Sequence, residues 1–397
     1  MRCISRMSPR RIHGRVFLVR VDLNIEEGGE NNAYRIHAVL PTILHLLRHK
    51  GKVVLLSHRG RPEPIRGIRN KELRIRNAAG QFSLKLFAGV LSKKLDQRVV
   101  FIPHFDFEKI EARIEVSNPG SIFLLENLRF LPGEEKNDSA LGMRLAALGD
   151  VFVNDAFAVS HRANASVSAM TKYIPSYAGF LLEQEIQNLD HAARNYVRPF
   201  TIIFGGAKIP DKIKVIQHFR NKADYFLLGG GPANTFFAAQ GLPIGDSLVD
   251  TKSIAFAKQY LKSRKIILPV DAERQGRKIL DVGPKTVEQF SVIIKKSRTI
   301  IWNGPMGFFE KKGFEGGTKG VWKSVLKNKK ALIVVGGGEL LVSFAKLVPR
   351  EYKKTVADVM KNVGRKTGGN LFLSTGGGAM IEYLSGKKLP GIEVLKI

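Results

Sequence analysis

The sequence contains one cysteine, Cys3, few acidic residues and no apolar run long enough to cross a bilayer. A single cysteine excludes an intramolecular disulfide and argues against a thiolate metal site, so the chain suits a reducing compartment and we expect it to be cytoplasmic. A membrane-spanning helix needs roughly 20 apolar residues, and no run here is that long. The first fifteen residues are basic and lack the apolar segment of a secretory signal. A short transit peptide and a start at Met7 both stay open.

Acidic residues number 35 against 64 lysines and arginines, which gives a formal net charge of +29. Such a charge raises nucleic acid as a partner, because phosphate polymers attract distributed positive charge. The basic residues are nevertheless spread along the chain, with no Cys/His zinc pattern, no RNP-type aromatic motif and no long basic tail. Nucleic-acid binding therefore stays open but is not the primary role that we expect. A basic host proteome or simple solubility is the explanation of the charge that we favour.

Apolar runs of the kind that form strands buried on both faces recur through the chain. Five runs in the second half end in glycine or a glycine-bearing turn: FTIIFGG (200–206), YFLLGGG (225–231), TIIWNGP (299–305), ALIVVGGG (331–338) and LFLSTGGG (371–378). Four runs in the first half end in charged or hydrogen-bonding side chains: VFLVRVD (16–22), KVVLLSHRGR (52–61), SIFLLENLR (121–129) and DVFVNDAF (150–157). Helical periodicity follows most of these runs, as at 38–50 and 139–149. The alternation predicts an α/β fold with parallel sheets.

The chain is longer than one domain usually is, since 397 residues exceed the common range of ~50–200. We predict a first domain over 1–175 and a second over 176–380, joined by a helix at 176–195. A loop at 61–75 and a lysine-rich stretch at 346–369 are interpreted as solvated excursions.

The glycine-ended strands of the second half predict phosphate binding, because glycine after a strand lets backbone N–H groups approach a phosphate closely. In GGAKIPDK (205–212), a helix that begins near Pro210 places Lys208 just before its start and Lys212 in its first turn, within reach of a nucleotide's phosphates. The alternative is a pair of solvated surface lysines. No Walker A sequence and no protein-kinase HRD or DFG signature occurs.

Two further motifs strengthen the nucleotide hypothesis. WNGPMGFFE (302–310) places Asn303 at a strand end and Glu310 where a carboxylate suits ribose hydroxyls, although a lone glutamate is usually a surface residue. VGGGE (335–339) exposes successive N–H groups at the positive end of a helix dipole, and Glu339 offers a hard oxygen ligand for Mg²⁺.

The first half predicts a site for a small anion. Ligands of open parallel sheets lie beyond the carboxyl ends of the strands, where these side chains are expected to meet: Asp22, Asn24, His58, Arg61, Arg129 and Arg162. Taken alone, Asp22 and Asn24 also fit a turn and cap pair, and a lone histidine is more often structural. Guanidinium groups suit a phosphate ester or an acid. No nucleophile motif is present, so we predict phosphoryl transfer without a covalent enzyme intermediate.

In chain order these segments closely resemble the phosphoglycerate kinase family. The resemblance runs from about residue 15 to the C-terminus and rests on RVDLN, YRIHAVLPTI, SHRGRP, ENLRF, NDAFAVSHRANAS, PSYAGFLLEQE, GGAKIPDKI, LLGGGPANTFF, LDVGPKT, WNGPMGFFE, VVGGGE, STGGGA and SGKKLPGIEVL. It implies reversible phosphoryl transfer from 1,3-bisphosphoglycerate to ADP with Mg²⁺. It also implies two Rossmann-like three-layer lobes with a hinge helix, a tail at 381–397 that packs on the N-terminal domain, and a monomer.

The resemblance also implies residue roles. Phosphoglycerate is expected at Asp22, Asn24, Arg35, His58, Arg61, Arg129 and Arg162. Nucleotide is expected at Gly206, Lys208, Lys212, Gly230, Gly283, Asn303, Glu310, Gly336, Gly337, Gly338 and Glu339, with Glu339 also the metal ligand. The catalytic groups are expected to be Arg35, Lys208 and the amides of Gly337 and Gly377. A metaphosphate-like transition state needs such fixed positive groups and closure of the two lobes more than it needs a strong base.

Several positions depart from the family pattern. Glu339 and Leu340 replace the usual Asp and small hydroxyl residue, which lengthens the metal ligand and removes a phosphate contact, while Pro210, Arg59 and Asn164 also differ. We predict that activity survives with weakened Mg²⁺–nucleotide affinity. The alternatives are a catalytically impaired homologue that binds phosphorylated ligands or nucleic acid, and a different small-molecule kinase on the same scaffold.

Overall fold

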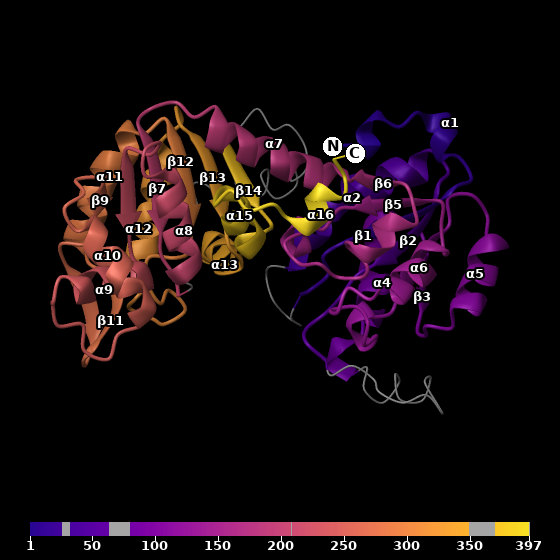
Figure 1. The fold of residues 1–397 in the computed structure, drawn as a ribbon, viewed down its shortest axis with the longest axis horizontal. Coiled ribbons are helices and arrows are strands. Elements are labelled where there is room, and N and C mark those ends of the chain that lie inside the picture. The colour runs from indigo at the N-terminus through magenta and orange to yellow at the C-terminus, as the bar shows by residue number, and fades with distance from the viewer. Residues whose placement is uncertain (26–31, 63–79, 208, 349–369, 397) are drawn as a thin grey trace. The chain divides into compact units, whose positions relative to one another are not determined.

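The computed structural model describes residues 1–25, 32–62, 80–207, 209–348 and 370–396. These residues form two compact units, one from Met1 to Glu185 with the C-terminal residues from Lys388, and one from Ile186 to Lys387. Each unit is built on a parallel sheet, which confirms the predicted α/β class (Figure 1). No helix within the described ranges is long and apolar enough to span a membrane.

The sheet of the first unit has the described strand order β3-β4-β2-β1-β5-β6. Its strands are β1 (Val16–Arg20), β2 (Lys52–Leu56), β3 (Val99–Ile102), β4 (Ile122–Leu125), β5 (Val151–Asn154) and β6 (Ser176–Ala178). The central strands are buried along their whole length, as their unbroken apolar runs predict. Strands β3 and β6 were not predicted, because they are edge strands with partly exposed residues and lack a long apolar run.

Helices cover both faces of this sheet. They are α1 (Pro9–Ile12), α2 (Asn32–Arg48), α4 (Lys85–Leu95), α5 (Phe107–Glu115), α6 (Ser139–Ala146) and α16 (Pro390–Glu393), with short 3₁₀ turns at Ile4–Arg6, Gly80–Phe82, Leu128–Phe130, Phe157–Val159 and Ala169–Lys172. Alternate strand residues such as Leu18 and Val54 share one core cluster with residues of α5 and α6. Helices α2 and α4 contact each other and the sheet through β2 and β3. The C-terminal α16 also belongs to this unit, since the Gly391 amide donates to the Ser160 carbonyl over 2.9 Å.

The sheet of the second unit has the described order β14-β13-β12-β7-β8-β9. Its strands are β7 (Phe200–Phe204), β8 (Tyr225–Leu228), β9 (Ile266–Ile267), β12 (Thr299–Asn303), β13 (Leu332–Gly336) and β14 (Leu371–Ser374). All five glycine-ended runs of the sequence are strands of this sheet. A separate antiparallel pair, β10 (Ala272–Gln275) and β11 (Lys278–Val282), was not predicted.

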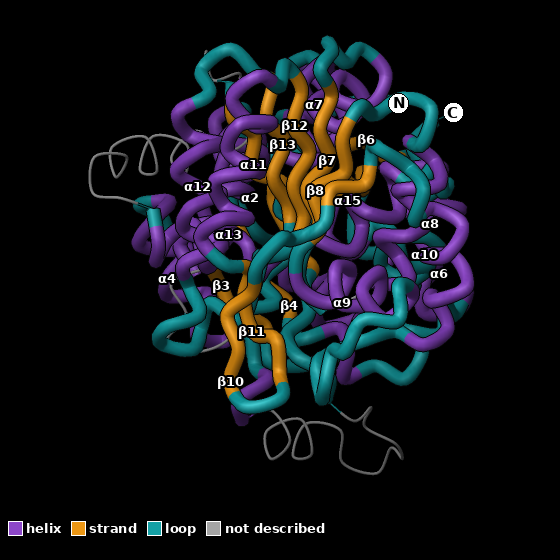
Figure 2. Tube along the Cα trace, turned by 90° about the vertical axis from the view of Figure 1, so that its left-hand side faces the viewer, coloured by secondary structure: helices purple, strands orange, loops and turns teal. Residues whose placement is uncertain are grey.

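The helices of the second unit lie in two layers. They are α8 (Ile209–Phe219), α9 (Gly230–Ala239), α10 (Ile254–Tyr260), α11 (Pro284–Lys296), α12 (Gly316–Lys327), α13 (Gly338–Leu347) and α15 (Gly377–Leu384), with a 3₁₀ turn at Thr251–Ser253. Helices α11, α12 and α13 contact one another in sequence, whereas α15, α8, α9 and α10 form the other contiguous set. Figure 2 shows α12 and α13 on one side of β12 and β13, and α8 and α10 on the other.

The structure corrects three boundaries of the predicted domains and linking helix. The tail that belongs to the first unit begins at Lys388 and not at residue 381, because α15 belongs to the second unit. Residues 176–178 are not part of a linking helix, because they form β6 and pair with β5 in the first sheet. The helix there is α7 (Phe180–Arg194), and the division between the units falls inside it, after Glu185 rather than near residue 175. Helix α8 begins at Ile209, one residue before the Pro210 start that the motif suggested, and Lys212 lies in its first turn as predicted. Lys208 and most of the loops predicted at 61–75 and 346–369 lie outside the described residues.

Candidate functional site

Asp22 and Asn24 follow β1 and organise the carboxyl end of the first sheet. The Asp22 carboxylate forms an ion pair with Arg35 and accepts a hydrogen bond from the Asn24 amide over 3.0 Å. The Asn24 side-chain oxygen in turn accepts from the Gly60 amide over 2.8 Å. Gly60 has φ +61°, and a Cβ there would lie 2.4 Å from the Phe82 ring, so this turn requires glycine. The polar ends of β1 and β2 are therefore fixed to each other.

His58 lies among arginines and is held neutral. Its ring is 3% exposed, and burial lowers its pKa well below 6.5. Neighbouring guanidinium groups lower this pKa further: those of Arg20, Arg129, Arg162 and Arg35. The Arg20 Nη2 lies 3.2 Å from His58 Nδ1, and since arginine only donates, Nδ1 accepts and the ring proton resides on Nε2. His58 thus offers a hydrogen-bond donor toward an anion without being protonated.

Arg129 carries buried guanidinium nitrogens that lack hydrogen-bond partners. It is 4% exposed, and burial lowers its pKa although the Glu135 carboxylate lies 3.2 Å from Nη2. Its Nη1 donates to the Gly60 carbonyl, whereas Nε and Nη2 have no hydrogen-bond partner within the described part of the chain. Because unsatisfied buried donors are costly, these nitrogens indicate a place for an anionic ligand.

A cavity of about 270 Å³ opens beside these groups. Its lining residues are Asn24, Ile25, Arg59, Gly60, Arg61, Arg129 and Arg162. The structure therefore brings the predicted Asn24, Arg61, Arg129 and Arg162 together around one cavity, with Asp22, Arg35 and His58 in the network behind it. Sequence reasoning missed Arg20, whose buried side chain also donates to Ser166 Oγ over 3.0 Å and supports His58.

In the second sheet, the chain runs outward from β7 through β8 to β9 on one side, and from β12 through β13 to β14 on the other, so the strand order reverses between β7 and β12. The carboxyl edge of such a switch point is where open parallel sheets bind ligands. There the Gly206 amide donates to the Pro305 carbonyl over 2.7 Å, and the Gly230 amide donates to the Met306 carbonyl over 2.9 Å. A Cβ on Gly205 would lie 1.9 Å from the Pro305 carbonyl oxygen, and one on Gly304 would lie 2.4 Å from the Gly205 oxygen. Only glycine permits these turns to interlock.

The two glycine turns after β13 and β14 approach each other closely. Gly337 has φ +124°, and a Cβ on Gly377 would lie 3.0 Å from the Gly337 Cα atom. Asn303 fixes the first turn by donating to the Gly336 carbonyl over 2.7 Å. The helices α13 and α15 begin at these turns, so the amides of both helix N-termini lie together. That arrangement suits an anion.

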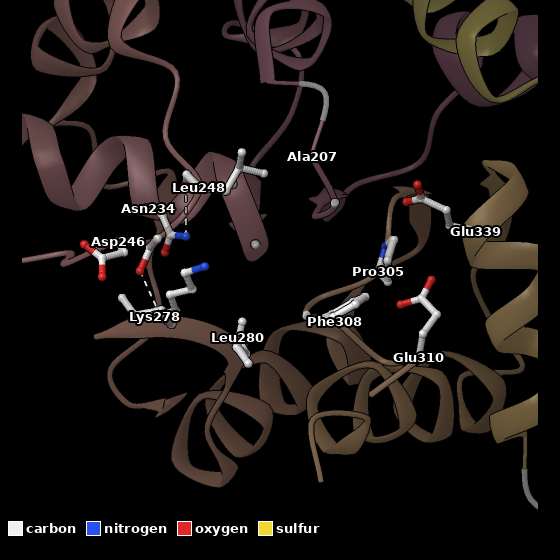
Figure 3. A pocket seen from close by; sticks show the side chains of 16 residues that line it. Ala207, Asn234, Asp246, Leu248, Lys278, Leu280, Pro305, Phe308, Glu310 and Glu339 are labelled. Atoms are coloured by element: carbon white, nitrogen blue, oxygen red, sulfur yellow. Dashed lines mark hydrogen bonds between the residues drawn. The ribbon is translucent and has the colours of Figure 1, made fainter. Parts of the chain in front are cut away.

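A pocket of about 520 Å³ lies along this glycine edge (Figure 3). At one end are the carboxylates of Glu310 and Glu339, and at the other are the side chains of Asn234, Asp246 and Lys278. Apolar side chains line the pocket as well: Leu248, Ile279, Leu280, Pro305 and Phe308. Phe308 is 52% exposed and lines the pocket, so its ring is accessible to a ligand there.

The two carboxylates interact electrostatically. Partial burial raises the pKa of Glu310, and the neighbouring Glu339 raises it further. A Cβ on Gly206 would lie 3.5 Å from both the Glu339 Oε2 and the Lys212 Nζ atoms, so a glycine turn, a cation and a carboxylate converge at this end. Such a mixture suits a phosphate chain with a divalent cation.

Of the predicted nucleotide residues, Gly206, Gly230, Glu310 and Glu339 line the pocket. Gly283 does not line it. A Cβ there would lie 2.4 Å from the Asp271 carboxylate, so packing of α11 against that side chain explains the glycine. Asn234, Lys278, Leu280 and Phe308 line the pocket and were missed as individual residues. All but Lys278 lie in motifs that the sequence singled out, GGGPANTFF, LDVGPKT and WNGPMGFFE, whereas nothing in the sequence marks Lys278.

Known proteins resemble this chain over nearly its whole length. The profile of one family, described as Phosphoglycerate kinase, matches residues 7–387. A phosphoglycerate kinase of Chloroflexus aggregans is 39% identical over 412 residues, which cover 96% of each chain. One of Chloroflexus aurantiacus is 40% identical over 412 residues with the same coverage.

Solved structures show the same fold. The structure of phosphoglycerate kinase from Coxiella burnetii superposes with a TM-score of 0.76 at 33% identity and covers 99% of this chain and 98% of its own. That from Pyrococcus horikoshii superposes with a TM-score of 0.81 at 30% identity and covers 100% and 98%. The resemblance predicted from the sequence is thereby confirmed, and the chain belongs to the phosphoglycerate kinase family.

Proposed function

We propose that the chain catalyses reversible phosphoryl transfer from 1,3-bisphosphoglycerate to ADP, with each unit holding one substrate. Family membership makes the chain a phosphotransferase that acts on a carboxyl group. The observation that carries the assignment of the two substrates is the contrast between the units. One offers a small cavity lined by guanidinium groups, and the other a longer pocket edged by glycine amides.

The first unit is proposed to hold the phosphoglycerate. A cavity of about 270 Å³ suits a three-carbon acid phosphate better than a nucleotide. Arg129 supplies two buried nitrogens that have no hydrogen-bond partner among the described residues, although Nη2 is ion-paired with Glu135, and Arg61 and Arg162 line the same cavity. Bidentate guanidinium contacts to phosphate and carboxylate are strong and directional, which supports this assignment. Asp22 orients Arg35 by ion pairing, and we infer that Arg35 turns toward the transferred phosphoryl group when substrate is bound.

The second unit is proposed to hold the nucleotide. The apolar side chains Leu248, Leu280 and Phe308 suit a base, and Gly206, Gly230 and the turns at Gly337 and Gly377 suit the phosphates. Lys212 begins its helix beside the phosphate end. Lys208 lies outside the described residues and enters only through the resemblance. We propose that it bridges the transferring group together with Arg35.

Mg²⁺ fits the carboxylate end of this pocket. Within the described ranges no three His, Cys, Asp or Glu side chains form a cluster that would hold a metal by themselves. The ion would therefore be held by nucleotide phosphates with Glu339, and Glu310 lies close enough for its pKa to respond to Glu339. When bound, Mg²⁺ neutralises phosphate charge. The chain's own amides and cations then position the phosphates and stabilise charge that develops on the equatorial oxygens.

The proposal needs no general base from His58, whose lowered pKa keeps it neutral. It does need the two substrates to meet with water excluded, since the acyl phosphate hydrolyses readily. We infer that α7, in which the division between the units falls, is the hinge. We also infer a cytoplasmic monomer.

The test is a coupled assay of ATP-dependent phosphorylation of 3-phosphoglycerate by the purified chain over a series of Mg²⁺ concentrations. We expect turnover that requires both substrates and the metal. A catalytically impaired homologue would give no turnover above background while still binding ADP, and a different small-molecule kinase would turn over only with another acceptor.

A further inference from the structure

The loop that follows β12 forms one wall of the nucleotide pocket and is held from two sides. On the pocket side its Pro305 and Met306 carbonyls accept the Gly206 and Gly230 amides. On the other side the Met306 amide donates to Thr318 Oγ1 over 3.0 Å, and the Phe308 amide donates to the Leu280 carbonyl over 2.7 Å. Thr318 belongs to the first turn of α12 and is fully buried. The N-terminus of α12 therefore supports the pocket wall from behind.

Asp281, the fourth residue of β11, fixes that N-terminus. Its Oδ2 accepts the Gly317 amide over 2.7 Å, and its Oδ1 accepts the Val282 amide over 2.9 Å. The side chain of Glu315, the residue before α12, does not cap the helix. The carboxylate of Asp281, which lies in β11, accepts a hydrogen bond from the first turn of α12 in its place. A Cβ on Gly307 would lie 2.2 Å from Asp281 Oδ1, and one on Gly317 would lie 2.4 Å from it. The loop and the helix thus both pack directly against this carboxylate.

We propose that Asp281 is a positioning residue for nucleotide binding: it locks the start of α12, and through Thr318 and Met306 it holds the loop that carries Phe308 and Glu310. Three hydrogen bonds connect Asp281 to the pocket: the Gly317 amide donates to Asp281, the Met306 amide donates to Thr318, and the Gly230 amide donates to the Met306 carbonyl. Asp281 itself is 2% exposed and does not line the main pocket. The inference rests on the proposed nucleotide role of this pocket, although not on turnover.

The chemistry of Asp281 gives this role a pH signature. Burial raises its pKa from 3.8 to about 7, the two backbone amides oppose that rise, and the carboxylates of Glu273 and Glu315 add to it. Ionised Asp281 accepts both amides, whereas protonation weakens the acceptor that holds Gly317. Nucleotide affinity should accordingly fall as the pH decreases through about 7. Binding at the arginine-lined cavity of the other unit should not follow the same curve.

The experiment measures dissociation constants for ADP and for 3-phosphoglycerate separately, by calorimetric titration of the full chain from pH 6 to pH 8. For Asp281→Asn we expect ADP to bind about tenfold more weakly at pH 8, which equals about 1.4 kcal/mol, with 3-phosphoglycerate unchanged. The part of the ADP pH dependence that belongs to this carboxyl should disappear in the variant. Thr318→Val should weaken ADP binding by a similar factor, because it removes the hydroxyl that accepts the Met306 amide, whereas Thr318→Ser, which keeps that hydroxyl, should bind ADP as the wild type does. The double variant with Asp281→Asn and Thr318→Val should lose less binding free energy than the sum of the two single losses, because both residues hold the same loop.

Asn328→Ala is the matched control. Asn328 directly follows the last residue of α12, and its side-chain amide donates to the Ile294 and Ser297 carbonyls at the end of α11. Since α12 has 12 residues and rises ~1.5 Å per residue, Asn328 lies about 18 Å from the helix start that Asp281 serves. It should lower stability without changing ADP affinity. The inference is overturned if Asp281→Asn binds ADP as the wild type does, or if Asn328→Ala weakens ADP equally. If Asp281→Asn does not fold, the Thr318 pair decides. A wild type that binds ADP but never phosphorylates 3-phosphoglycerate would refute the proposed function and leave this inference standing.

Discussion

Asp155→Asn should stabilise the first unit, and increasingly so as the pH rises. Asp155 follows β5 and is fully buried, and it serves the N-terminus of α7 by accepting hydrogen bonds from the Thr42 hydroxyl and from the Leu181 and Leu182 amides. Its Oδ2 has no hydrogen-bond partner among the described residues. Asparagine keeps Oδ1 as the acceptor and places its amide where Oδ2 stands, so the substitution removes the charge with little change of shape.

The magnitude follows from the pKa. Burial raises the pKa of Asp155 from 3.8 to about 7, although the hydrogen bonds from Thr42, Leu182 and Leu181 oppose the rise. Between these two values the folded chain keeps a proton that the unfolded chain has released, so this group lowers stability as the pH increases. Each pH unit is worth about 1.4 kcal/mol, which gives a loss of about 4 kcal/mol by pH 7 and above. The variant should escape this loss, and the two proteins should be equally stable near pH 4.

The assay can separate the units. Both tryptophans, Trp302 and Trp322, lie in the second unit, so their fluorescence reports its unfolding, whereas far-UV circular dichroism reports both. Urea unfolding at pH 5, 6, 7 and 8 should show a transition of the first unit that moves to higher urea in Asp155→Asn by an amount that grows with pH. The tryptophan transition serves as the internal reference.

Asp138→Asn is the control for a helix cap without such burial. Asp138 caps α6 by accepting the Leu141 amide over 2.7 Å. Its substitution should cost stability by a nearly constant amount over the same range. A stability gap between wild type and Asp155→Asn that stays flat with pH, or one that shrinks as pH rises, would refute the reasoning.

Three further predictions concern the sites. Arg129→Met should weaken 3-phosphoglycerate binding by about 10²-fold and leave ADP binding unchanged in calorimetric titrations, because two buried charged donors are lost; equal affinity would remove Arg129 from the site. Gly304→Ala should weaken ADP at least about tenfold and lower the unfolding temperature, because the new Cβ would lie 2.4 Å from the Gly205 oxygen and φ is +84°; a variant with normal ADP affinity contradicts the interlocked turns. Glu339→Asp should tighten Mg²⁺-dependent ADP binding by shortening the ligand, which titrations at several Mg²⁺ concentrations would show. An unchanged or weaker metal dependence counts against Glu339 as the metal ligand.

The strands and the class of ligand could be predicted from the chain because their signals are local. The nine apolar runs form the four central strands of each sheet and the edge strand β14, since burial on both faces favours an unbroken apolar run. The glycines that follow β7, β8 and β12 likewise mark places where the backbone approaches other groups closely. Edge strands such as β3 and β6, which are only partly buried, leave a weaker record and were missed.

The supporting residues could not be predicted. Arg20 lies inside β1, where it has the appearance of an interruption in an apolar run, and its role exists only because His58 and Ser166 fold against it. Lys278 reads as one surface lysine among many until β11 places it in the pocket. Gly283 was predicted to touch nucleotide because it lies in the LDVGPKT motif; the structure shows that it packs against Asp271, and its contact with nucleotide stays a prediction. A glycine in the sequence indicates that some group lies close to the backbone, but it does not tell whether that group is a ligand or another part of the protein.

By itself, therefore, the sequence determined the family, the parallel sheets and the two kinds of anion-binding chemistry, because each rests on neighbouring residues or on motif order. The tertiary structure alone decided which groups are buried without partners and which carboxyls titrate near neutrality. Arg129, Asp155 and Asp281 are ordinary charged residues in the chain. Their pKa values depend on burial and on groups that other helices and strands place beside them, and neither can be inferred from the neighbouring residues in the sequence.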